Sequence, residues 1–109
     1  MPNIRTFGSI IAGARRARLL SQKELAARIM KDDGTPISPQ YLNDIERDRR
    51  NAPSEFLVAQ FASQLDLDRD LLCLMAGALP QDLADCISRV EPERVSEEFR
   101  VFRKSIQRR

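Results

Sequence analysis

The segment SPQYLNDIERDRRN, residues 38–51, constrains this chain most, because it carries a helix start, an apolar face and an opposite polar face. Ser38 is a residue type favoured at a helix N-cap, and Pro39 suits the first helical position, where its missing N–H and fixed φ carry no penalty. The apolar residues share one face of a helix that starts there, namely Tyr41, Leu42 and Ile45. The segment therefore predicts a short amphipathic helix that buries this face.

The opposite face of this helix carries polar side chains that can read the edges of DNA bases. They are Gln40, Asn43, Asp44 and Arg47. Glutamine and asparagine can bond to adenine through two hydrogen bonds, arginine can bond to guanine in the same way, and aspartate can accept from the cytosine amino group. The pattern indicates a base-reading helix, although an ordinary solvated helix face can have the same composition.

Two segments, in this order, resemble the XRE, or lambda-repressor-like (Cro/C1-type), family of helix-turn-helix transcriptional regulators. SQKELA, residues 21–26, resembles the first helix of the motif, and residues 38–51 resemble its second helix with the exit loop. The family pattern reads roughly TQxELA, a turn, then SxxYLSxIE and a basic loop. The resemblance extends over about residues 7–79 and implies a DNA-binding protein with the fold of that family.

The resemblance and the apolar spacing together predict an all-α chain with two parts. Residues 1–79 are expected to form a five-helix lambda-repressor-like helix-turn-helix domain, and residues 80–109 a two-helix C-terminal extension. Helical spacing predicts the first two helices over residues 6–19 and 22–30. The turn after them, KDDGTPI (residues 31–37), is longer than in the family pattern, so we expect an extended excursion with unchanged helix packing.

Two further helices close the predicted core. Ser54 and Asp68 are their expected N-caps. The fifth helix is predicted to turn four apolar residues inward, namely Leu71, Leu72, Met75 and Leu79. Cys73 and Cys86 also lie in helical apolar patterns, and we interpret both as small buried hydrophobic residues.

The resemblance implies contacts within the domain as well as with DNA. Arg15 and Glu46 match a partly buried ion pair that fixes the first helix against the recognition helix, although Arg15 is also part of a basic cluster. Gln22 matches a glutamine that touches the DNA backbone; a polar residue of a capping turn is the alternative. The implied base contacts are Pro39, Gln40, Asn43, Asp44 and Arg47. The implied phosphate contacts are Gln22, Lys23, Ser38, Tyr41, Arg49, Arg50 and Asn51.

The loop RDRRNAP, residues 47–53, follows the recognition helix and is rich in arginine. Flexible charges of this kind suit phosphate contacts more than base reading. Asp48 stands where the family often has glycine, and aspartate tolerates the left-handed conformation in which a helix can end. A solvated basic loop is the alternative interpretation.

The C-terminal tail carries a narrow apolar stripe at 4-3-4 spacing. Its residues are Val95, Phe99, Phe102 and Ile106. Such a stripe needs a partner surface, so we expect the tail to form a homodimer interface. A helix that folds back onto its own domain is the alternative.

The composition limits the remaining possibilities. The chain has 109 residues, a formal net charge of +2 and no histidine, and its first fifty residues hold 10 basic and 6 acidic groups. A basic N-terminal half fits a phosphate-facing surface. With no histidine, no nucleophile–base pair and no glycine loop for phosphates, we expect no metal, no cofactor and no enzymatic activity. No apolar run reaches the length of a membrane span and no signal pattern is visible, so a cytoplasmic protein without membrane contact is expected.

Two function hypotheses follow from these patterns. The first is a sequence-specific double-stranded DNA-binding transcriptional regulator, a repressor that binds an inverted-repeat operator as a homodimer. The alternative is an antitoxin-type protein, whose tail binds a partner protein and whose DNA binding is autoregulatory. A co-purifying or genetically adjacent toxin would favour the second.

Overall fold

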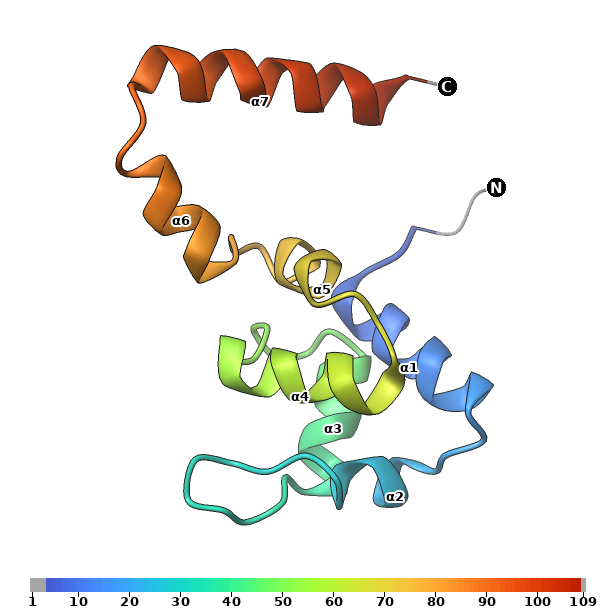
Figure 1. The fold of residues 1–109 in the computed structure, drawn as a ribbon. Helices are drawn as coiled ribbons and strands as arrows, with labels where there is room; N and C mark the ends of the chain where they lie inside the picture. Colours follow the sequence, from blue (N-terminus) through green and yellow to red (C-terminus); the bar gives the residue numbers. More distant parts are fainter. Residues whose placement is uncertain (1–3, 109) are drawn as a thin grey trace. The chain divides into compact units, whose positions relative to one another are not determined.

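The computed structural model describes residues 4–108, which form seven α-helices and no strand, and this confirms the predicted all-α class (Figure 1). The chain divides between Leu79 and Pro80 into two compact units. The first unit holds α1 (Phe7–Ala17), α2 (Gln22–Ala26), α3 (Pro39–Glu46), α4 (Glu55–Leu65) and α5 (Arg69–Met75). The second holds α6 (Gln81–Ile87) and α7 (Pro92–Gln107).

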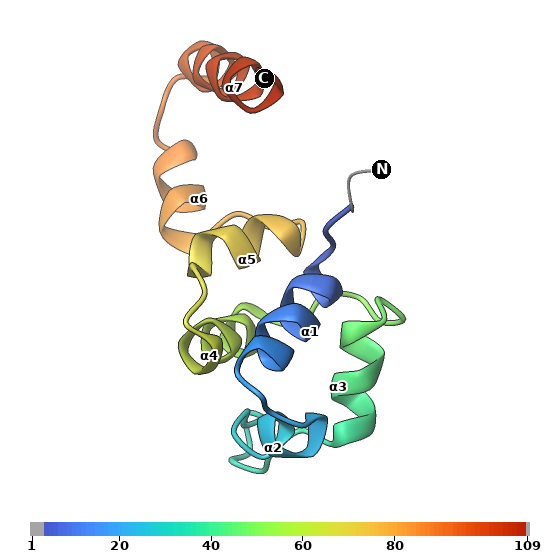
Figure 2. The same ribbon diagram turned by 90° about the vertical axis from the view of Figure 1, so that its right-hand side faces the viewer.

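The five helices of the first unit enclose one core. Helix α1 packs against both α3 and α4, α2 packs against α3, and α4 packs against α5. Figure 2 shows α1 lying between α3 and α4. Each of the five helices contributes a side chain with 0% exposed surface, namely Ile11, Leu25, Leu42, Phe61 and Leu72. Burial of these side chains supplies the main driving force for packing α3 in place.

Helix α2 is shorter than its apolar spacing predicts, and the expected end at Met30 was wrong. The helix ends at Ala26, and the backbone of Met30 is bonded instead to the Gln60 side chain of α4. The Met30 N–H donates to Gln60 Oε1 at 2.7 Å, and Gln60 Nε2 donates to the Met30 carbonyl at 2.7 Å. Ile29 still reaches the core, with 0% exposed surface, but from a turn.

The long turn between α2 and α3 is an extended loop whose two ends are joined by hydrogen bonds. Met30 pairs with Pro36 in an isolated antiparallel bridge, and the Lys31 N–H donates to the Thr35 carbonyl at 2.7 Å. Gly34 has a φ of +84°, a conformation that favours glycine at the tip of a turn. The Ile37 N–H then donates to the Ile29 carbonyl at 2.9 Å. The two ends of the turn therefore lie side by side before α3 begins.

Three expected core positions were wrong. Leu71 is 43% exposed and Leu79 is 45% exposed, because α5 ends at Met75 and buries only Leu72 and Cys73, which were also expected in the core. Cys86 is also exposed, since α6 contains no buried residue. Cys73 is buried as predicted, and this burial raises the pKa of its thiol.

Gly8 is a point where helices α1 and α3 come close. A Cβ atom added at Gly8 would stand against the backbone carbonyl oxygen of Ile45 and 2.7 Å from that of Glu46. We expect Gly8→Ala to lower the free energy of unfolding by about 1–3 kcal/mol, because backbone atoms must move apart. Denaturant titration of the full chain measures this change.

Gly13 provides a matched control in the same helix. A Cβ atom added there would meet nothing within 4 Å. Gly13→Ala should therefore raise the free energy of unfolding by about 0.5–1 kcal/mol, the usual gain for alanine in a helix interior. Equal effects of the two substitutions would show that the close approach at Gly8 does not limit stability.

Candidate nucleic-acid interface

Local signals define the start of helix α3. The Ser38 hydroxyl accepts from the Tyr41 N–H at 3.0 Å, which caps the helix, and Pro39 occupies its first turn. Leu42, Ile45 and Glu46 form its buried face. The polar face opposite this buried side is consequently held in a fixed orientation.

A buried ion pair joins α3 to α1. Arg15 Nε lies 2.7 Å from Glu46 Oε2, Arg15 Nη2 donates to Glu46 Oε1 at 2.9 Å, and both residues are 8% exposed. Arg15 Nη1 also donates to the Leu20 carbonyl at 2.9 Å. The Glu46 carboxylate raises the pKa of Arg15 above its ordinary value, while burial acts in the opposite direction. This bidentate geometry is that of a strong charge-assisted pair.

Gln22 extends the same network to α2. Its Nε2 donates to Glu46 Oε1 at 2.9 Å and to Asn43 Oδ1 at 3.1 Å. The first residue of α2 is thus bonded to two residues of α3. Because both N–H groups of the Gln22 amide are used inside the protein, its oxygen is the atom left to accept a further bond.

The outward residues of α3 form a second network. Gln40 Nε2 donates to Asp44 Oδ1 at 3.0 Å, and Arg50 Nε pairs with Asp44 Oδ2 at 3.3 Å. The Arg50 guanidinium also lies 5.1 Å from the centre of the Tyr41 ring. The i,i+4 spacing of Gln40 and Asp44 is a signal that could have predicted their bond. No comparable signal predicts the position of Arg50.

The basic loop after α3 is tied to the start of α1. Asp48 has a φ of 56°, in the left-handed region. Its carboxylate accepts from the Thr6 hydroxyl at 2.6 Å and from the Gly8 N–H at 3.0 Å. The carboxylate lies at the positive end of the α1 dipole, which favours negative charge. This tether, between residues far apart in sequence, was not predicted.

The other candidate DNA contacts lie on the surface of the same unit. Pro39, Gln40 and Arg47 are exposed, whereas Asn43, Asp44 and Tyr41 are half-buried. The exposed residues of the expected phosphate set also include Lys23, Ser38, Arg49 and Asn51. Within residues 4–108, the side chains of Lys23, Arg49 and Asn51 form no hydrogen bond or ion pair.

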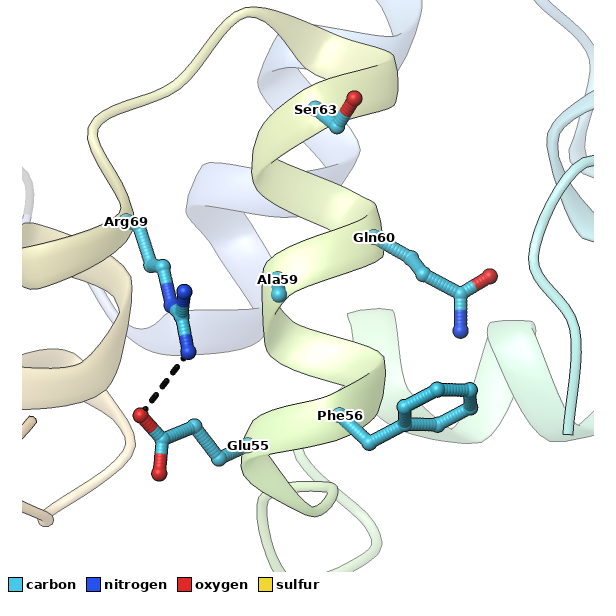
Figure 3. A pocket seen from close by; sticks show the side chains of 6 residues that line it. All are labelled: Glu55, Phe56, Ala59, Gln60, Ser63 and Arg69. Atoms are coloured by element: carbon cyan, nitrogen blue, oxygen red, sulfur yellow. Dashed lines mark hydrogen bonds and ion pairs between the residues drawn. The ribbon is translucent and has the colours of Figure 1, made fainter. Parts of the chain in front are cut away.

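A separate open groove of about 460 Å³ runs along α4 (Figure 3). Its lining residues are Glu55, Phe56, Ala59, Gln60, Ser63 and Arg69. Arg69 Nη2 donates to Glu55 Oε1 at 3.0 Å, and Figure 3 shows this pair at one side of α4. The groove contains none of the expected DNA contacts. Among residues 4–108, no group of three or more acidic or cysteine side chains is placed to hold a metal ion.

The sequence matches the helix-turn-helix family HTH_3 over residues 11–72, more than half of the chain. The chain belongs to the XRE-type helix-turn-helix family. This confirms the predicted family and supports a DNA-binding transcriptional regulator. In a helix-turn-helix protein the second helix of the motif is the recognition helix, which here corresponds to α3.

A solved structure described as the SinR protein/SinI protein complex has a similar fold. The match has a TM-score of 0.51 and 22% sequence identity, and it covers 92% of this helix-turn-helix chain and 99% of that chain. No curated protein matches the sequence. None of the helices within residues 4–108 is long and apolar enough to cross a membrane.

Proposed function

We propose that this protein is a sequence-specific double-stranded DNA-binding repressor that binds an inverted-repeat operator as a homodimer. The observation that carries the proposal is the polar face of α3. It presents Gln40, Asn43 and Asp44 from a helix whose opposite face is fixed by its core contacts and by the Arg15–Glu46 pair. Rigid presentation of amide and carboxylate groups is what base reading in the major groove requires.

The expected base contacts are Pro39, Gln40, Asn43, Asp44 and Arg47, which lie on α3 or directly after it. Phosphate contacts are proposed for the residues around them, namely Lys23, Ser38, Tyr41, Arg49 and Asn51. Gln22, expected in the same set, has both amide N–H groups bonded inside the protein, and a phosphate oxygen cannot donate to its remaining amide oxygen, so we propose no side-chain phosphate contact for it. Arg50 differs from this group because its guanidinium already pairs with Asp44.

Operator binding needs no further partner to block transcription sterically, so repression is the regulation we propose. A reporter gene placed behind the operator should be less active when the protein is present.

If α3 reads bases in the DNA major groove, two single variants should lose affinity for the specific DNA site. Gln40→Ala and Asn43→Ala should each weaken binding to the duplex selected from a random-sequence pool by about 1–3 kcal/mol, with non-specific binding nearly unchanged. Competition between the selected duplex and an unrelated duplex measures this difference.

Gln64→Ala, on α4, is the control for removal of a surface amide. It should leave both affinities unchanged. If Gln40→Ala and Asn43→Ala bound the selected duplex as tightly as Gln64→Ala, the α3 face would not be the base-reading surface.

The second unit supports the proposed homodimer. Phe99 is 55% exposed, Phe102 is 48% exposed and Ile106 is 68% exposed along one side of α7. Together with Val95 they form the α7 stripe, and a two-fold mate of α7 can bury it. Two recognition helices about one duplex turn apart would then read the two halves of an inverted repeat.

A second candidate function is favoured by one comparison. A chain of similar fold has been captured in a complex, that of the SinR and SinI proteins. By analogy, α6 and α7 of this chain would bind a partner protein, as an antitoxin does, and DNA binding would serve autoregulation. Purification of the full chain from its native source would show a stoichiometric second protein in this case and only the homodimer in the first.

A further inference from the structure

Arg50 differs from the other loop arginines in its contacts. Its Nε lies 3.3 Å from Asp44 Oδ2, and its guanidinium lies over the Tyr41 ring at 5.1 Å from the ring centre. Arg49 makes no side-chain hydrogen bond or ion pair with any residue in the range 4–108. Two adjacent arginines of equal charge are therefore held differently, one against α3 and one in solvent.

Asp44, the partner of Arg50, contacts Gln40 as well. The Asp44 side chain is 18% exposed, whereas that of Arg50 is 56% exposed. Asp44 bonds to Arg50 through Oδ2 and accepts from Gln40 Nε2 through Oδ1 at 3.0 Å. One carboxylate thus joins the loop arginine to the most exposed amide of the recognition helix.

This bond determines which atoms Gln40 can offer to DNA. A carboxylate only accepts hydrogen bonds, so the Gln40 amide must turn its NH₂ group toward Asp44. The second N–H and the oxygen of the amide remain free. An adenine edge requires this combination, because its N7 accepts and its N6 amino group donates.

We propose that Arg50 is a positioning residue for base recognition, acting through Asp44 on the Gln40 amide. This inference rests on the proposed function of α3. The Arg50–Asp44–Gln40 relay sets the base preference at the single base pair that Gln40 reads. Arg49, by contrast, contacts phosphate and carries no base preference.

Binding to duplexes with single base-pair changes distinguishes the positioning role of Arg50 from the phosphate contact of Arg49. The full chain first selects a duplex from a random-sequence pool, and Gln40→Ala identifies the base pair at which preference depends on that residue. Arg50→Ala, Arg50→Lys and Arg49→Ala are then measured against the selected duplex, its single-base-pair variants and an unrelated duplex of equal length. Ratios between duplexes are compared, because a partly unfolded sample lowers binding to all of them equally.

Arg50→Ala should reduce the preference at the Gln40 base pair by about 10-fold and leave the preferences at positions read by neither Gln40 nor Asp44 unchanged. Arg50→Lys keeps the charge but not the planar group over Tyr41, so it should retain the salt dependence without restoring that preference. Arg49→Ala should weaken binding to every duplex by one common factor and reduce the log–log salt slope by about one. The double variant Gln40→Ala/Arg50→Ala should lose no more preference than Gln40→Ala does.

Two other results would overturn the relay. If Arg50→Ala weakened binding to all duplexes by one factor and lowered the salt slope as Arg49→Ala does, Arg50 would be a phosphate contact. The proposed function would stand in that case. If the parent protein selected no sequence from the pool, both the proposed function and the relay would be wrong.

Discussion

Replacing Glu46 by alanine should lower the free energy of unfolding by about 3–5 kcal/mol, because the guanidinium of Arg15 would remain buried without its partner. Arg15 donates to both carboxylate oxygens of Glu46, and both residues are 8% exposed. Gln22 would lose an acceptor in the same variant. Urea titration of the full chain, followed by far-UV circular dichroism, measures the change.

Replacement of both charges at once is the control. Arg15→Met combined with Glu46→Leu removes the buried charge together with its partner, so it should destabilise the domain less than Glu46→Ala alone. The difference between the two variants isolates the effect of a stranded charge from that of lost packing. A Glu46→Ala protein that unfolds at the same urea concentration as the parent would contradict the energetic role of the pair.

Local sequence signals were sufficient to predict α3. Its cap, its first-turn proline and its apolar spacing all lie within residues 38–46. The end of α2 was missed, because Gln60 takes the Met30 backbone bonds from thirty residues away. The exposed side of α5 was missed for a similar reason: which leucine faces inward depends on how α4 lies, and spacing alone does not give that.

The candidate interface shows the same limit. Its proposed base-reading face follows from residue types and helical spacing, whereas the Arg15–Glu46 pairing is expected only through the family resemblance. The bonds from Asp48 to Thr6 and Gly8 connect positions about forty residues apart. Arg50 pairs with Asp44 and lies over Tyr41 after the chain has turned at Asp48, which has a left-handed conformation. Contacts of this kind depend on tertiary packing and have no periodic signature.

The α7 stripe gives the second large prediction, a coupled loss of dimer and of operator affinity. Val95, Phe99, Phe102 and Ile106 share one side of α7, and the Phe99 and Phe102 ring centres lie 6.1 Å apart. An aspartate at Phe99 would place a charge in the centre of a pairing surface, where no water could solvate it. Phe99→Asp should therefore convert the dimer to a monomer in sedimentation equilibrium.

Val101→Asp is the matched control, because Val101 is 63% exposed on the side of α7 away from the stripe. It adds the same charge to the same helix and should remain dimeric.

Affinity for a duplex with both half-sites should fall about 100-fold or more in Phe99→Asp, since the second recognition helix is no longer tethered. Affinity for a duplex with one half-site should be unchanged, because α3 and its contacts lie in the other unit. This pair of measurements separates loss of the dimer from damage to the reading surface.

A parent protein that sediments as a monomer would remove the stripe from any dimer interface and favour a helix that folds back onto its own domain. A parent dimer that persists in Phe99→Asp would place the two-fold contact elsewhere, and affinity for the full operator would then stay equal to that of Val101→Asp.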